Sequence, residues 1–201
     1  MDHSRNIQKA EEQKTTWSQD FLSCLKDLSY MLSVVLILFL LVFRSAEVNG
    51  SSMVPTLYNG DRLLMVSNLL YPTARPGDVV VIHERDFENQ YNLVKRVIAT
   101  EGQTVDIDFE QGIVYVDGKA LEEPYVNTPT NLSEGMKFPL TVPEGCVFAM
   151  GDNRNNSMDS RDPKVGFINQ REIFGKALLI AIPGPSPDTE KRDFSRIGVI
   201  R

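Results

Sequence analysis

Ser52 lies in a stretch whose neighbours restrict the backbone. The stretch reads Asn49-Gly50-Ser51-Ser52-Met53-Val54-Pro55-Thr56-Leu57. Gly50 can adopt a positive φ, while Pro55 fixes its own φ and favours extended geometry at Val54. Such a segment can hold a hydroxyl in one direction, as a nucleophile requires. Gly/Ser stretches are also usual linker material, so these residues alone leave a flexible linker open.

A serine hydroxyl is a weak nucleophile unless a nearby group takes its proton. Histidine is the usual base, and the chain contains two histidines. His3 lies in the N-terminal segment, and His83 ends a valine-rich strand where a structural role is the simpler interpretation. A Ser-His-Asp triad is therefore poorly supported.

Lysine is the alternative base. At an ordinary pKa near 10.4, fewer than about one lysine in a thousand is neutral at pH 7, so a basic lysine has to be buried. In a strand, Lys95 shares a face with Leu93 and Val97. Lys176 has almost equally apolar neighbours, so the pattern favours Lys95 only slightly. The non-catalytic alternative for Lys95 is an edge-strand charge that discourages aggregation.

A third polar stretch, residues 151–161, follows an apolar strand and reads GDNRNNSMDSR. A solvated loop could have this composition. However, Asp159 and Arg161 can form charge-assisted pairs, and the hydroxyl of Ser157 can donate or accept a hydrogen bond. The stretch therefore indicates a scaffold that holds other groups in place.

Composition excludes several classes of protein. The 201 residues suggest one principal domain with an accessory segment. The net charge of −6 argues against a nucleic-acid binder, which needs a basic face. Cys24 and Cys146 lie on either side of an apolar run, which argues against a disulfide between them. With so few histidines and cysteines, we expect no metal site and no cofactor.

The apolar run from Leu28 to Phe43 is about 24 Å long as a helix, slightly short of a usual membrane span. Lys26 and Arg44 can reach the two interfaces. A core helix would carry a polar face, and a cleaved signal peptide would need small residues before the cut. The run therefore predicts an uncleaved anchor. Basic residues are more frequent before it, which places the N-terminus in the cytoplasm.

The rest of the chain predicts a mainly β domain of short antiparallel strands. Asp117-Gly118 suits a type I′ hairpin turn, and 122–140 reads as loop. Strands are expected at 61–66, 79–83, 92–99, 103–109, 113–116, 119–121, 145–150 and 172–182. We divide the chain into a cytoplasmic segment (1–27), an anchor (28–43), an extracytoplasmic domain (44–183) and a polar tail (184–201).

Together, the three stretches resemble type I signal peptidases, which are membrane-anchored Ser-Lys proteases that remove signal peptides from exported proteins. Their serine motif corresponds to Ser52-Met53-Val54-Pro55-Thr56-Leu57 and their lysine motif to Lys95-Arg96-Val97. The third motif corresponds to residues 151–161. The order and spacing also match, and the resemblance covers about 28–182.

The resemblance implies a role for each matching residue. Ser52 would be the nucleophile and its backbone N–H an oxyanion donor, with Lys95 as general base. Ser157 would orient Lys95, and Asp159 and Arg161 would brace that region. For the substrate, the implied contacts are Met53, Leu93 and Val94, with alanine-sized residues at −3 and −1. The implied partners are signal peptides, membrane lipid and the secretion machinery.

Two positions depart from the family pattern. Gly50 stands where some members carry a serine that completes the oxyanion hole; members from Gram-positive bacteria also have glycine there. Asn155 stands where an aspartate is frequent. Lys95 argues for the bacterial type, because eukaryotic endomembrane relatives use histidine at that position.

Two other classes of protein remain to be weighed. One is a non-catalytic, membrane-anchored assembly factor for surface structures with the same β domain; it would be expected to lose Ser52 or Lys95. The other is a self-cleaving repressor-like Ser-Lys protein. The apolar anchor and the absence of a DNA-binding helix pair argue against the repressor.

Overall fold

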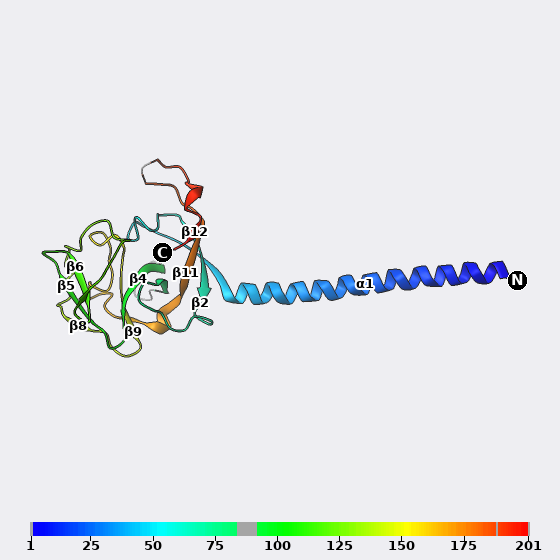
Figure 1. The fold of residues 1–201 in the computed structure, drawn as a ribbon, viewed down its shortest axis with the longest axis horizontal. Coiled ribbons are helices and arrows are strands. Elements are labelled where there is room, and N and C mark those ends of the chain that lie inside the picture. Colours follow the sequence, from blue (N-terminus) through cyan, green and yellow to red (C-terminus); the bar gives the residue numbers. More distant parts are fainter. Residues whose placement is uncertain (1, 84–91, 188, 201) are drawn as a thin grey trace. The chain divides into compact units, whose positions relative to one another are not determined.

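The computed structural model describes residues 2–83, 92–187 and 189–200. The chain divides into two compact units, Met1–Leu41 and Val42–Arg201. The first is formed by helix α1 (Asp2–Val42), shown in blue in Figure 1. Its part Asp20–Val42 is long and apolar enough to cross a membrane, and its side chains are exposed. The helix thus begins well before the predicted anchor at Leu28, and Phe43 belongs to the first strand instead.

The second unit is mainly β, as predicted. Its larger sheet is antiparallel, with the order β1-β2-β11-β3-β4-β9-β10, and β12 pairs with β11. These strands are β1 (Phe43–Glu47), β2 (Arg62–Ser67), β3 (Val79–His83), β4 (Asn92–Thr100), β9 (Cys146–Met150), β10 (Ile168–Asn169), β11 (Ile173–Ile182) and β12 (Gly198–Val199).

A smaller antiparallel sheet has the order β7-β6-β5-β8. Its strands are β5 (Thr104–Asp108), β6 (Ile113–Val116), β7 (Lys119–Ala120) and β8 (Leu140–Thr141). Asp117 and Gly118 both have positive φ, which a type I′ turn requires. Figure 1 shows β5, β6 and β8 at the side of the domain away from β2, β11 and β12.

Three buried clusters hold the domain together. One packs Met53 and Leu57 against β2, β3 and β11, and another lies under β3, β4 and β9. The third joins the two sheets through β4, β5, β6 and β9. In the third cluster, Phe109, Phe138, Phe148 and Phe167 form a chain of edge-on ring contacts. The polar stretches predicted to do chemistry are therefore attached to a packed core.

Two short 3-10 helices, η1 (Gln170–Glu172) and η2 (Phe194–Arg196), complete the described elements. Residues 184–201 had been predicted as a polar tail. In the structure the described end of this tail contains β12, whose Gly198 pairs with Ile180 of β11.

Candidate active site

Ser52 lies between β1 and β2 in a segment that is anchored on both sides. Met53 and Leu57 are fully buried, and the N–H of Leu57 donates to the carbonyl of Met53 at 2.9 Å. Gly50 has a φ of +93°, which favours glycine, and its N–H donates to Asn59 Oδ1 at 2.8 Å. Ser52 itself is half-buried. A flexible linker is therefore the wrong interpretation of this stretch.

Lys95 is buried in β4, with only 2% of its surface exposed. Its Nζ donates to Ser157 Oγ at 3.1 Å. Burial lowers the pKa of Lys95 to about 8, although the charges of Asp159 and Glu134 oppose this shift. At that pKa about a tenth of the amine is neutral at pH 7, far more than for an exposed lysine.

Gly151 brings the serine segment next to Ser157. The carbonyl of Ser52 accepts a hydrogen bond from the N–H of Asn153 at 2.9 Å. A Cβ on Gly151 would lie 2.5 Å from the Ser52 carbonyl oxygen and would overlap the side chain of Ser157. Only glycine fits between them. Lys95 Nζ contacts the hydroxyl of Ser157. Within the described residues, no hydrogen bond joins Lys95 Nζ to Ser52 Oγ.

Asp152 links the three sequence motifs directly. Its buried carboxylate accepts from Thr56 Oγ1 of the serine segment at 2.5 Å. It also accepts from Arg96 Nε and Nη2 at 2.8 and 2.7 Å, in the two-point geometry that makes such pairs strong. Arg96 directly follows Lys95 in β4, so one carboxylate fixes the serine segment, the lysine strand and the 151–161 segment together.

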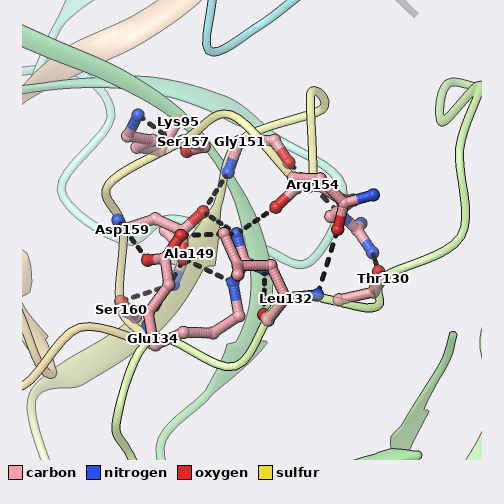
Figure 2. A network of polar contacts seen from close by, with 12 residues as sticks. Lys95, Thr130, Leu132, Glu134, Ala149, Gly151, Arg154, Ser157, Asp159 and Ser160 are labelled. Atoms are coloured by element: carbon pink, nitrogen blue, oxygen red, sulfur yellow. Dashed lines mark hydrogen bonds and ion pairs between the residues drawn. The ribbon is translucent and has the colours of Figure 1, made fainter. Parts of the chain in front are cut away.

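Asp159 and Arg161 form a second buried pair, and Figure 2 shows Asp159 near Gly151 and Ser157. Both Arg161 Nε and Nη2 contact the carboxylate of Asp159 at 2.8 Å, and the N–H of Gly151 donates to it at 2.9 Å. Burial pushes the pKa of Asp159 up, but these donors hold it below its ordinary value. The pair stays ionised and fixes the turn that carries Ser157.

Residues 122–140 had no predicted role, and they supply most of the partners of two buried arginines. Arg154 Nη1 contacts Glu123 and Thr130 at 2.8 and 2.9 Å. Arg161 donates to the carbonyl of Leu132 at 3.0 Å and lies 3.4 Å from Glu134. The ring of Tyr125 lies 3.9 Å from the guanidinium of Arg96. The sequence of this segment stands out only by its many turn-forming residues, which do not indicate these contacts.

Asn155 also binds this segment. Its Nδ2 donates to the carbonyl of Pro129 at 2.9 Å, and its Oδ1 accepts from the N–H groups of Asn131 and Leu132 at 3.1 Å. An aspartate could accept from the same two N–H groups but could not donate to Pro129. The departure from the family pattern at this position therefore has a structural use.

The other predicted residues fall in different places. Met53 and Val94 are buried in the same core cluster, and Leu93 is half-buried beside the cluster under β3 and β4. Lys176, the alternative base, pairs with Asp78 at 2.5 Å and is not joined to Ser157. His83 is the last residue of β3, and its side chain lies outside the described part of the chain.

One edge of β4 is unpaired near Lys95. Residues 93–95 pair with β3, but β9 pairs only with Arg96 and the residues after it. Among the described residues, no strand lies against the other edge of Leu93–Lys95. An extended peptide could add there as a further strand. No group of three or more metal-binding side chains occurs in the described ranges.

Comparisons with known proteins place the chain in a family. The family model described as signal peptidase, peptidase S26, matches residues 22–182. A probable signal peptidase I-1 from Synechocystis is 42% identical over 166 residues, covering 76% of this chain and 80% of the relative. Signal peptidase I of Bacillus licheniformis is 33% identical over 181 residues, covering 86% of this chain and 95% of the relative. Signal peptidase I T of Bacillus subtilis is 33% identical over 186 residues, covering 89% and 92%.

A crystal structure of a signal peptidase I from Enterococcus faecalis aligns with a TM-score of 0.42 and 30% identity, covering 52% of this chain and 96% of that one. The match of the family model extends from within α1 to the last residue of β11, and the relatives align over most of their length. This chain belongs to the peptidase S26 family of signal peptidases.

Proposed function

We propose that this chain is a membrane-anchored endopeptidase that removes signal peptides from exported preproteins with Ser52 and Lys95. The observation that carries the proposal is the buried Lys95, whose pKa is lowered to about 8 and whose Nζ contacts Ser157 beside the backbone of Ser52. Family membership supports the reaction class, and the arrangement of the three motifs supports the assignment of roles.

In the proposed reaction, neutral Lys95 takes the proton of Ser52 Oγ as the oxygen attacks the scissile carbonyl. The tetrahedral intermediate collapses to an acyl-enzyme, and the resulting ammonium of Lys95 protonates the leaving amine. Lys95 then takes a proton from water as the water oxygen attacks the acyl carbonyl, and the Lys95 ammonium returns that proton to Ser52 Oγ as the acyl–oxygen bond breaks and the carboxylic acid product leaves. Ser157 keeps the amine in place throughout.

The backbone N–H of Ser52 is the proposed oxyanion donor. It donates to no other group among the described residues, so it is available for a developing charge. Gly50 carries no side-chain donor, and its own N–H is already bound to Asn59. The second donor of this hole has to come from another residue.

The substrate is proposed to lie extended along the free edge at Leu93 and Val94, with Met53 forming one wall. The proposed substrate carries alanine-sized residues at −3 and −1, as the resemblance of the three motifs implies. Helix α1 is proposed to anchor the enzyme with its N-terminus in the cytoplasm. The domain then meets lipid and preproteins leaving the secretion machinery on the outer face.

The test is cleavage of a signal-peptide substrate by the full chain in detergent. Wild type is expected to cut after Ala-x-Ala, to fail when either alanine is replaced by leucine, and to lose activity in Ser52→Ala. The matched control is Ser51→Ala, which changes the neighbouring hydroxyl and is expected to retain activity. If wild type is inert on several substrates, also in lipid, the non-catalytic assembly factor replaces this proposal.

A further inference from the structure

Asp61 is a fully buried carboxylate that the proposed mechanism does not use. It follows the serine segment and directly precedes β2. Its oxygens accept from the N–H groups of Tyr58 and Gly184, both at 2.7 Å. They also accept from Arg196 Nη1 at 3.0 Å and Nη2 at 2.7 Å. A buried charge with four donors is held in one position, and Arg196 is its only cationic partner among the described residues.

Arg196 contacts the serine segment at two further places. Its Nη2 donates to the carbonyl of Thr56 at 3.3 Å, and its guanidinium stacks on the ring of Tyr58 at 3.8 Å. One side chain from the C-terminal tail thus holds a carboxylate, a carbonyl and an aromatic ring of the 56–61 turn. A planar guanidinium can make these contacts together, whereas an ammonium cannot.

These contacts reach Ser52 through short connections. The hydroxyl of Thr56 binds Asp152, which orients Arg96 beside Lys95. The N–H of Leu57, the next residue, binds the carbonyl of Met53, which directly follows Ser52. Because Thr56 meets both Arg196 and Asp152, a shift of the 56–61 turn changes the direction of Ser52 relative to Lys95.

The tail that carries Arg196 has its own attachments. The N–H of Ile200 donates to the carbonyl of Leu178 at 3.0 Å, and β12 pairs with β11. The side chain of Asp193 accepts from the N–H of Ser195 and so caps η2, the short helix that contains Arg196. In the described part of the chain, the side chain of Arg192 donates to the carbonyl of Pro183 alone, at 3.0 Å. Arg196 is therefore presented to Asp61 from a fixed backbone.

We propose that Arg196 and Asp61 are positioning residues, and that the C-terminal tail holds the serine segment in its reactive geometry through this ion pair. The proposal rests on the proposed function of Ser52 and Lys95. It assigns to residues 193–200, predicted as a polar tail, a part in the reaction that the three sequence motifs do not contain.

The test compares Arg196→Met, Arg196→Lys and the control Arg192→Met in the full chain. Arg196→Met keeps the apolar stem on Tyr58 and removes the cation. We expect it to lower kcat by about 10- to 100-fold and to leave KM within about twofold, since the serine is misdirected while the substrate edge of β4 is intact. Arg196→Lys is expected to fall between Arg196→Met and wild type, and Arg192→Met to match wild type.

Hydrogen exchange supplies a readout that does not depend on activity. In Arg196→Met, the amides of residues 53–61 are expected to exchange about tenfold faster or more, while those of β4 and β9 are unchanged. The pH midpoint of kcat/KM is expected to stay at the wild-type value, because Lys95 keeps its surroundings.

Two results would overturn the proposal. One is a folded Arg196→Met or Arg196→Lys variant with wild-type kcat and wild-type exchange at residues 53–61. The other is faster exchange throughout the domain with a loss of activity that follows the unfolded fraction, which would show a role in global stability only. If wild type has no peptidase activity the proposed function fails, and the exchange pattern still decides whether Arg196 positions the segment.

Discussion

Lys95 and Lys176 occupy the same row of the larger sheet but differ in burial and in the group that contacts the amine. Both pair in register with Val80, Lys95 from β4 and Lys176 from β11. Lys95 is 2% exposed, and its Nζ contacts the neutral hydroxyl of Ser157. The side chain of Lys176 is 31% exposed, and its Nζ lies 2.5 Å from the carboxylate of Asp78.

The difference indicates which of the two strand lysines is better suited to act as a base. Apolar neighbours along the strand are similar for the two residues, which explains why the sequence pattern hardly separates them. A contacting carboxylate stabilises the ammonium, whereas burial against a hydroxyl favours the neutral amine. The groups that face each ammonium come from distant parts of the chain, Ser157 for Lys95 and Asp78 for Lys176.

The sharpest test of this contrast replaces each lysine in turn by methionine, which keeps most of the stem. Lys95→Met is expected to lower kcat/KM by about 1,000-fold or more, because no other amine among the described residues contacts Ser157. Lys176→Met is expected to stay within about threefold of wild type and to lose less than about 1 kcal/mol of stability, as for a partly exposed ion pair. Cleavage assays and thermal melts of both variants measure this; comparable activity losses would show that Lys176 shares the chemistry.

Removing the partner of each lysine is expected to have a smaller effect. Ser157→Ala leaves the amine of Lys95 free to turn away from Ser52, so kcat is expected to fall about 10- to 100-fold with KM nearly unchanged. Asp78→Asn is expected to leave kcat at the wild-type value. The same cleavage assay measures both, and full activity in Ser157→Ala would remove the hydroxyl from the positioning of Lys95.

The smallest expected effect is a shift in the pH profile. Because the neutral amine is the active form, kcat/KM is expected to rise with pH and to level off above a midpoint near 8. The charge of Glu134 raises the pKa of Lys95, so Glu134→Gln is expected to move the midpoint to lower pH. Lys176→Met serves as the control with an unchanged midpoint. A midpoint that moves upward in Glu134→Gln would contradict the assignment of Lys95 as the titrating base.

Local pattern was enough for most of the fold. β3 was predicted with its observed bounds at 79–83, and the paired positive φ values at Asp117 and Gly118 followed from their residue types. β1 was missed because Phe43–Glu47 has one fully buried residue and gains its strand geometry from pairing with β2. The short strands β8, β10 and β12 each cover two residues, too few for a period to appear.

The motif residues of the candidate site, including Ser157, Asp159 and Arg161 as supports, could be named from sequence, but the supporting residues outside the motifs could not. Tyr125 reaches Arg96 and Glu123 reaches Arg154 from a segment without period or motif. Arg196 and Asp61 are 135 residues apart. Such pairs are set by tertiary packing, and a single sequence carries no local sign of them.

The distance along the chain between Thr56 and Arg196 also sets an order of events during synthesis. The ribosome adds the 140 residues that separate them at about 5–20 residues per second, which takes on the order of 10 s. Once translation has passed residue 161, the nascent chain contains all three sequence motifs, while Asp61 still lacks its cationic partner Arg196. On the proposal that Arg196 positions the serine segment, activity is expected only after translation has passed residue 196. A chain that ends between residues 161 and 196 would contain every motif of the family but lack the Arg196–Asp61 ion pair.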